Sequence, residues 1–484
     1  MKFSSYIVAS IGVLFFGAGA VFFFVEGAQV ASARAVDQSA SIYHVVRVLL
    51  GAEEETKVSA NEMVEVVEPV PYTKLTGKVL QESPESIDLS GKNVVADLTS
   101  MQIFLYEDKR LVTVVPIVSI GKPGSAWETP PGQYAINTKV ENHFSSFGHV
   151  WMPYSMQFFG NFFIHGWPYY PDGTPVSEGY SGGCIRLTTE DAEKMYGFVD
   201  VGTTVHVFGT AASSVFVEPG RSYYLLDASS SVPAVTAPSY LVADLDTGEI
   251  LFQKNVTEKR SIASLTKLMT AVVSLETINQ FNTITISQRA VATHGDAGGL
   301  RAGDMLMVKD VLYPLLLESS NDAGEVIAEQ VGREWFIRNM NKKARSIGLS
   351  ATSFADPSGL SADNISTAED VFKLMRYIYD YKTFLLGITQ KKTASVDRYV
   401  WNNHSRFIND PTYLGGKNGY TSAAVHTLVS LFEVQLSEFE TKNIAIVLLG
   451  SDNKEEDARA LLDYISKNVY YAGEEEIKAQ VKLL

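Results

Sequence analysis

Cysteine is almost absent from this sequence, because Cys184 is the only one in 484 residues. A single cysteine cannot form a disulfide within its own chain, so an internal disulfide framework is excluded. Basic residues are also scarce, with 40 Lys and Arg against 55 Asp and Glu, and the net charge is −15. A chain of this charge offers no basic face to replace counterions, which argues against binding to nucleic acid.

Long uncharged apolar runs are equally scarce, and the one that stands out extends from Tyr6 to Val25. At about 1.5 Å per residue, about 20 residues reach across the ~30 Å core of a bilayer. We interpret residues 1–27 as a signal anchor, with a signal peptide cleaved near Ala33 as the alternative. The predicted location is the extracytoplasmic cell envelope, either anchored to the cytoplasmic membrane by residues 6–25 or secreted after cleavage.

Composition changes along the chain predict several segments. Residues 28–91 are acidic, and much of Ala52–Lys92 has the pattern of a weakly ordered spacer. Alternating apolar runs over residues 92–209 predict a mostly β domain, with one helix that follows an N-cap at Thr188. Residues 210–235 are rich in Ser, Ala and Pro and are expected to be a linker.

The remaining chain mixes helix and strand patterns, so residues 236–471 are expected to form an α+β domain. A β-hairpin is predicted from Tyr240, with its turn at Asp246–Gly248. Residues 472–484 are expected to be a tail that contains a solvated helix end. The fold class is therefore multidomain, with an N-terminal transmembrane or signal helix, a mostly β domain and an α+β domain.

The neighbours of Cys184, in the stretch GYSGGCIRL, are those of a reactive thiol. A thiol needs a nearby base or cation to become a thiolate, and His165 follows an apolar strand to supply one. Gly182 and Gly183 let backbone approach closely, so amide groups can hold an oxyanion, and Arg186 can hold a substrate carboxylate. From these residues alone, a buried and unreactive cysteine is still an alternative. His143 and His149 are interpreted as loop residues and not as ligands.

The ordered motifs TPPGQYAI, MPYSMQFFGNFFIHG and YSGGCIRL resemble the L,D-transpeptidase catalytic domain of the YkuD type, over roughly residues 92–208. The resemblance implies that Cys184 is the acylated nucleophile and that His165 is its base. It also implies that the backbone of Gly166 orients the imidazole, and that Ser181 and Arg186, which belong to the signature, are among the substrate-binding or oxyanion residues. Gly182 departs from the pattern, because many members have histidine there.

Three further motifs occur in order in the second half, namely SLTK, SSNDA and GGKNGYT. Lys267 follows Ser264 by three residues, so on a helix its amine can lie beside the hydroxyl. The amine can then take the hydroxyl proton, provided that burial or neighbouring cations lower its pKa. Taken alone, this spacing is equally typical of a solvated helix face. The later motifs add Ser319, Asn321, Lys417 and Gly419.

Together with DTGEILFQKN and DPSGL, these motifs resemble the D-alanyl-D-alanine carboxypeptidase branch (peptidase S11) of the penicillin-binding proteins, over roughly residues 236–471. The resemblance implies a penicillin-binding, β-lactamase-like fold in which Ser264 is acylated, Lys267 activates it and Ser319 relays the proton. The substrate-binding groups that it implies are Asn321, Lys417, Gly419 and the backbone of Ser264 and Tyr420. Asn418 stands where the family has threonine, so Asn418 or Thr421 is expected to contact the substrate carboxylate.

The two resemblances together imply a bifunctional peptidoglycan enzyme. The serine domain would trim pentapeptide stems to tetrapeptides, and the cysteine domain would use tetrapeptides to form 3→3 cross-links. The expected partners are peptidoglycan stem peptides, with β-lactams as inhibitors, and neither a metal nor another cofactor is expected. Two alternatives are that one domain is an inactive wall-binding module, or that the serine domain is a β-lactamase or an endopeptidase.

Overall fold

The computed structural model describes residues 72–80, 87–209, 220–227, 229–295, 298–438 and 440–481. The predicted signal anchor or signal peptide lies outside these residues. Among the helices within the described ranges, none is both long enough and apolar enough to cross a membrane. All the described residues belong to one compact unit of the chain.

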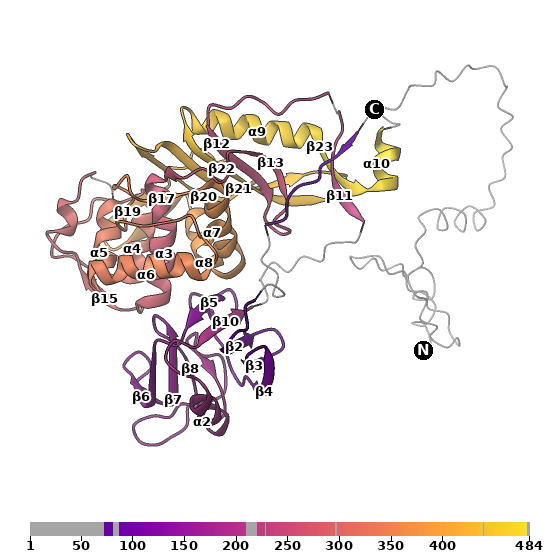
Figure 1. The fold of residues 1–484 in the computed structure, drawn as a ribbon. Coiled ribbons are helices and arrows are strands. Elements are labelled where there is room, and N and C mark those ends of the chain that lie inside the picture. The colour runs from indigo at the N-terminus through magenta and orange to yellow at the C-terminus, as the bar shows by residue number, and fades with distance from the viewer. Residues whose placement is uncertain are drawn as a thin grey trace, which may run out of the picture. The chain divides into compact units, whose positions relative to one another are not determined.

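The N-terminal domain, residues 87–209, contains two sheets (Figure 1). The first has the strand order β4-β3-β2-β10-β5 and comprises β2 (Lys92–Asp97), β3 (Gln102–Glu107), β4 (Arg110–Pro116), β5 (Gly132–Ala135) and β10 (Thr204–Phe208). The second has the order β6-β7-β8-β9 and comprises β6 (Thr138–Ser145), β7 (Val150–Phe159), β8 (Phe162–His165) and β9 (Ile185–Arg186). Both sheets contribute to one apolar core, which includes Val94 and Ile164.

One helix of this domain, α2 (Thr189–Phe198), begins where the sequence predicts it. The hydroxyl of Thr188 accepts a hydrogen bond from the backbone N–H of Asp191, so the predicted N-cap is confirmed. His143 lies within β6, so its interpretation as a loop residue is wrong, whereas His149 lies in the turn before β7.

The C-terminal domain, residues 220–481, is built on a sheet with the order β13-β12-β22-β21-β20. Its strands are β12 (Ser239–Asp244), β13 (Ile250–Lys254), β20 (Tyr413–Thr421), β21 (Val425–Gln435) and β22 (Thr441–Ser451). Side chains along β12 alternate between two apolar clusters, with Leu241 in one and Val242 in the other. The sheet is therefore buried on both faces. The predicted hairpin is confirmed, because β12 pairs with β13.

Helices cover both faces of this sheet (Figure 1). On one side lies α9 (Lys454–Asn468). The others are α3 (Thr266–Thr277), α4 (Val308–Leu317), α5 (Asn321–Glu329), α6 (Arg333–Ser346), α7 (Ala368–Tyr381) and α8 (Thr383–Thr389). Short pairs complete the domain: β14 (Arg260–Ser261) with β17 (Ile365–Ser366), β15 (Thr283–Thr285) with β16 (Met305–Met307), and β18 (Thr393–Val396) with β19 (Tyr399–Asn402). Two 3₁₀ helices are η2 (Ala263–Leu265) and η3 (Ala290–Ala292).

Part of the predicted spacer and part of the predicted linker are ordered strands, so both predictions need correction. In a three-stranded sheet, β11 (Arg221–Leu225) pairs with β1 (Thr73–Lys74) on one side and with β23 (Val469–Gly473) on the other. Leu80, also in the predicted spacer, is buried in the core of the C-terminal domain. These strands pair with residues far away in sequence, so local composition does not reveal them.

The predicted solvated tail also needs correction. Helix α10 (Glu474–Val481) is not fully solvated, because Ile477 is completely buried. This side chain packs in a small apolar cluster with Tyr224 and Ala472. The C-terminal segment is therefore docked on the same small sheet that contains β11.

Candidate active sites

The serine site, which we define as Ser264, Lys267, Ser319, Asn321 and Lys417, is centred on the start of α3. Ser264 lies on η2 and Lys267 is the second residue of α3, so the SLTK motif joins a 3₁₀ turn to an α-helix. Every residue of α3 is buried, as expected for a central helix. Nζ of Lys267 and the hydroxyl of Ser264 are hydrogen-bonded at 2.9 Å.

The environment of Lys267 favours the neutral amine. Its side chain is completely buried, and it also donates to Oδ1 of Asn321 at 2.7 Å and to the carbonyl of Ser358. Burial, reinforced by the positive charge of Lys417, lowers the pKa of Lys267 well below its ordinary value. A neutral amine keeps two N–H groups for Asn321 and Ser358 and turns its lone pair to the Ser264 hydroxyl, so it can act as a general base.

The DPSGL motif forms the wall behind this serine. The carboxylate of Asp356 accepts hydrogen bonds from the backbone N–H groups of Ser358 and Gly359 and so shapes the loop. At Gly359 the φ angle is +86°, and an added Cβ would lie 2.0 Å from the carbonyl oxygen of Ala263. Sequence reasoning used this motif only as part of a resemblance and missed that its Ser358 carbonyl holds Lys267.

On the opposite side of the site lies β20, the edge strand of the sheet. The amine of Lys417 donates to the hydroxyl of Ser319 at 2.9 Å, and burial together with Lys454 lowers the pKa of Lys417 to about 7. Ser319 has a φ of +62°, a strained value for a residue that is not glycine. In this structure the Ser319 hydroxyl is hydrogen-bonded to Lys417, the residue predicted to bind the substrate carboxylate.

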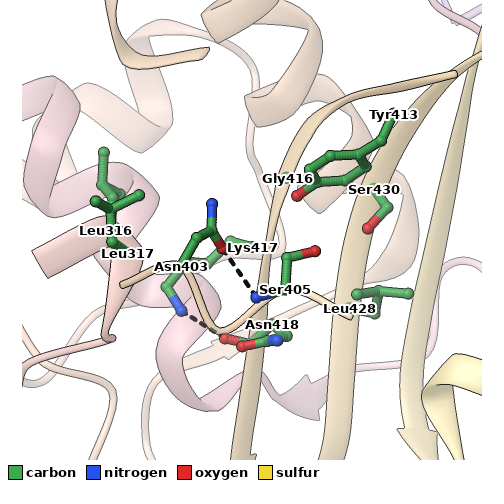
Figure 2. Close-up of a pocket in the computed structure, with 10 residues that line it drawn as sticks. All are labelled: Leu316, Leu317, Asn403, Ser405, Tyr413, Gly416, Lys417, Asn418, Leu428 and Ser430. Atoms are coloured by element: carbon green, nitrogen blue, oxygen red, sulfur yellow. Dashed lines mark hydrogen bonds between the residues drawn. The ribbon is translucent and has the colours of Figure 1, made fainter. Parts of the chain in front are cut away.

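Figure 2 shows a small cavity that Lys417 lines. The amine of Lys417 also donates a hydrogen bond to the carbonyl of Asn418 at 2.7 Å. The cavity measures about 10 Å³, which suits one water molecule. The side-chain amide of Asn418 points toward the carbonyl of His404, at 3.5 Å. The hydroxyl of Thr421 accepts from the backbone N–H of Ala424 in the turn after β20. Both predicted carboxylate contacts are thus already engaged with backbone.

Gly419 lets β20 approach the nucleophile. An added Cβ at this position would lie 2.7 Å from the backbone nitrogen of Ser264 and 3.1 Å from Cβ of Ala263. The backbone of β20 therefore runs directly beside the Ser264 N–H. The next residue, Tyr420, is exposed, and its ring packs on His426.

The thiol site, which we define as His165, Cys184 and Arg186, lies where β8 and β9 run in parallel. His165 is paired with Arg186, and Ile164 is paired with Ile185. Because side chains alternate along a strand, the two isoleucines face the core while His165, Cys184 and Arg186 share the other face. This face lines a cavity of about 320 Å³.

Both reactive groups of the thiol site are neutral at pH 7. The Nδ1–H of His165 donates to the carbonyl of Gly166 at 2.6 Å, which leaves Nε2 as the proton acceptor. Burial lowers the pKa of His165 to about 4 and raises the pKa of Cys184 to about 11. The thiol donates to the carbonyl of Asn161 at 3.6 Å, so its proton is directed to this backbone oxygen.

The loop before Cys184 is held by its own side chains. The hydroxyl of Ser181 donates to the carbonyl of Cys184 at 2.6 Å and accepts from the backbone N–H of Gly183 at 3.0 Å. Ser181 therefore shapes the loop, and it occupies the Gly183 amide that was predicted to hold an oxyanion. Gly183 has a φ of +104°, and an added Cβ would lie 2.2 Å from the ring of Phe162. At Gly182, by contrast, an added Cβ meets open space.

Arg186 brings a positive charge to the lining of this cavity. Its guanidinium lies over the ring of Trp167 at 5.6 Å, and burial lowers its pKa. Within the described ranges, its buried Nε has no hydrogen-bond partner. Sequence reasoning missed two lining residues, His143, which stacks on Phe163 at 4.8 Å, and Asn161, whose contact is made by a backbone carbonyl.

The chain thus has a serine in contact with a buried lysine amine, and a cysteine that lines one cavity with a buried imidazole. A family model described as D-alanyl-D-alanine carboxypeptidase (peptidase S11) matches residues 227–451, and one described as the L,D-transpeptidase catalytic domain (YkuD) matches residues 91–207. The D-alanyl-D-alanine endopeptidase of Escherichia coli is 30% identical over 46% of this chain and 74% of its own length. The chain therefore belongs to the D-alanyl-D-alanine carboxypeptidase family and also carries a YkuD-type domain.

Other relatives match the same part of the chain. The D-alanyl-D-alanine carboxypeptidase DacF of Bacillus subtilis is 30% identical to this chain. The match covers 47% of this chain and 61% of DacF. The crystal structure of a D-alanyl-D-alanine carboxypeptidase from Mycobacterium tuberculosis has 26% identity and a TM-score of 0.45, and the match covers 49% of this chain and 93% of that one.

Proposed function

We propose that this protein trims and cross-links peptidoglycan stem peptides, with one acyl-enzyme formed at Ser264 and another at Cys184. The observation that carries the proposal is the direct hydrogen bond between the buried amine of Lys267 and the Ser264 hydroxyl. The family membership and the YkuD match support the same reaction classes. The proposed location of the protein is the extracytoplasmic cell envelope. The proposed membrane anchor at residues 6–25 lies outside the described residues.

At the serine site, neutral Lys267 takes the hydroxyl proton as Oγ of Ser264 attacks the carbonyl between the two terminal D-alanines of a pentapeptide. The C–N bond breaks, the terminal D-alanine leaves with a proton relayed through Ser319, and water hydrolyses the ester to release a tetrapeptide. The N–H groups of Ser264 and Tyr420 stabilise the oxyanion, and Lys417 holds the terminal carboxylate. β-Lactams are expected to acylate the same serine.

At the thiol site, the Cys184 proton passes to Nε2 of His165 as the sulfur attacks the carbonyl of the third stem residue. The fourth residue leaves with that proton, and a thioester remains on the enzyme. An amine of a second stem then attacks the thioester and forms a 3→3 cross-link. Arg186 supplies the positive charge for the carboxylate of the donor. The product of the serine site is therefore the donor for the thiol site.

A second candidate function for the serine site is cleavage of existing cross-links. Relatives from Escherichia coli and Pseudomonas aeruginosa are named D-alanyl-D-alanine endopeptidases, at 30% and 32% identity. The same serine chemistry serves both reactions, because only the leaving amine differs.

Product masses distinguish these functions. Purified pentapeptide stems, tetrapeptide stems and cross-linked dimers are each incubated with the wild type, Cys184→Ala and Ser264→Ala, and the products are analysed by mass spectrometry. We expect Ser264→Ala to leave pentapeptides intact and Cys184→Ala to form no 3→3 dimers from tetrapeptides. Cleavage of dimers with pentapeptides left intact would favour the endopeptidase, and product formation by both variants would refute the proposal.

A further inference from the structure

Helix α3 reaches both sites of the chain. Lys267 lies at its start, and its last residue, Thr277, meets the N-terminal domain. The side-chain amide of Asn161 donates to the backbone carbonyl of Thr277 at 2.8 Å, which satisfies one of the carbonyls left free at a helix end. The backbone carbonyl of the same Asn161 accepts the thiol of Cys184 at 3.6 Å. Two hydrogen bonds thus lead from α3 to the thiol.

The cavity around Cys184 has one wall from the C-terminal domain. Leu275, Glu276 and Ile278, at the end of α3, line it together with residues of the N-terminal domain. Trp127 lines the same cavity and is held from two sides. Phe147 of its own domain meets it edge-on at 4.9 Å, and Phe281 of the C-terminal domain stacks on it at 5.8 Å.

Buried charges hold the two domains together at this wall. The carboxylate of Glu276 lies 3.1 Å from the amine of Lys343 and 3.4 Å from that of Lys382, and all three side chains are completely buried. Each amine also has a partner in the N-terminal domain: Lys343 donates to the hydroxyl of Tyr134 at 2.9 Å, and Lys382 donates to the carbonyl of Glu128 at 3.3 Å. Buried charges are costly unless such partners are present, so undocking the domains is unfavourable.

We propose that the C-terminal domain is a structural part of the thiol site, with Asn161 and Phe281 as positioning residues. The acyl donor is bound between the domains, against Leu275 and Ile278 at the end of α3, and the same wall partly covers the thiol, which is half-buried. This inference deepens the proposed function and rests on it for the identity of the donor. The placement of the thiol is independent of that function and can be tested separately.

The single cysteine provides the test, because iodoacetamide can alkylate no other thiol. Asn161→Ala removes the contact with α3, and Phe281→Ala removes an exposed ring that holds Trp127. Either change loosens the wall, so the thiol gains water and its pKa falls toward the ordinary range. Since one pKa unit is tenfold in thiolate, we expect alkylation at pH 8 to be about tenfold faster than in the wild type.

Two matched variants serve as controls in the full-length chain. Asn137→Ala removes a hydrogen bond of the same length, 2.8 Å, from an asparagine amide to a carbonyl within the N-terminal domain. Trp335→Ala removes an exposed ring at the start of α6. Both should react at the wild-type rate, and all variants should still be acylated by penicillin at Ser264 if the C-terminal domain is intact. Equal alkylation rates in all four variants and the wild type would overturn the proposal.

Enzyme kinetics with tetrapeptide test whether the same wall binds the acyl donor. If the wall binds the donor, Phe281→Ala should raise the KM for tetrapeptide by about tenfold with a smaller change in kcat, as for lost binding energy. A wild type that forms no cross-links but shows the expected alkylation pattern would refute the proposed function and leave the composite wall supported. If the wild type forms cross-links but Phe281→Ala and Asn161→Ala leave the alkylation rate and the KM unchanged, the proposed function is supported and the composite wall is refuted.

Discussion

The two sites of this chain differ in how far they are assembled before substrate arrives. At the serine site, Lys267 already touches the hydroxyl of Ser264 at 2.9 Å. At the thiol site, the thiol donates to the carbonyl of Asn161, and His165 holds its other nitrogen against Gly166. Both bases act in their neutral form, but an amine is ordinarily protonated at pH 7 and needs its surroundings to make it neutral, whereas an imidazole is ordinarily neutral.

Burial has opposite uses at the two sites. It lowers the pKa of Lys267, so the fold itself prepares the base. It also raises the pKa of Cys184 to about 11, so the fold withholds the thiolate. The serine site is therefore expected to be reactive in the resting state, and the thiol site is expected to become reactive only when bound substrate turns the thiol toward His165.

The largest expected effect concerns the prepared base. Lys267→Ala should slow the acylation of Ser264 by fluorescent penicillin by about a thousandfold, because a positioned general base typically contributes 10²–10⁴-fold. Lys373→Ala, which removes a lysine that pairs with Glu369 on α7, is the control and should be acylated normally. A loss of less than tenfold in Lys267→Ala would show that the serine site is not assembled around this amine.

The pH dependence of alkylation sharpens the contrast. With a thiol pKa of about 11 and a His165 pKa of about 4, Cys184 is a neutral thiol beside a neutral imidazole between pH 7 and 9. The thiolate fraction then rises tenfold per pH unit, so the iodoacetamide rate should increase about 100-fold over this range. A rate that is already on a plateau at pH 7 would indicate a thiolate–imidazolium pair instead.

Two adjacent glycines test how the thiol loop is built. Gly183→Ala places a Cβ 2.2 Å from the ring of Phe162 at a positive φ, whereas Gly182→Ala places it in open space. We expect Gly183→Ala to lower the free energy of unfolding by about 2 kcal/mol, which is about 30-fold in the equilibrium constant. Gly182→Ala should stay within about 0.5 kcal/mol of the wild type. Urea denaturation measures both, and equal effects would contradict the loop geometry.

The smallest expected effect concerns the donor carboxylate. Arg186→Gln removes the cation from the thiol cavity, and kcat/KM for tetrapeptide should fall about tenfold, as for the loss of one charged hydrogen bond. Arg110→Gln, at an exposed position of β4, should leave the rate unchanged. If Arg186→Gln is as active as the wild type, the donor carboxylate is bound elsewhere.

Sequence patterns predicted the features that depend on near neighbours. The N-cap at Thr188 and the β12–β13 hairpin follow from local residue preferences, and the structure contains both. The pairing of β1 and β23 with β11 was not predicted, because each partner is far away in sequence. Composition suggested a spacer and a linker there, although long-range pairing orders both.

In the candidate sites, the SLTK motif predicted that Lys267 meets Ser264, but the motifs did not predict what positions the reactive groups. The carbonyls of Ser358 and Asn161 hold Lys267 and Cys184 respectively, and a backbone carbonyl leaves no signature in residue type. Similarly, the sequence placed Ser181 among the substrate-binding residues, whereas its hydroxyl holds the loop around Cys184. Contacts that backbone groups make, and contacts between domains, cannot be predicted from residue types and are found only in the structure.

The most direct test of the account looks for both acyl-enzymes in the same sample. The full-length protein is mixed with pentapeptide stems, quenched in acid during turnover, digested and mapped by mass spectrometry. We expect an ester on the peptide that contains Ser264 and a thioester on the peptide that contains Cys184. Accumulation of tetrapeptides and 3→3 dimers with either residue never modified would contradict it.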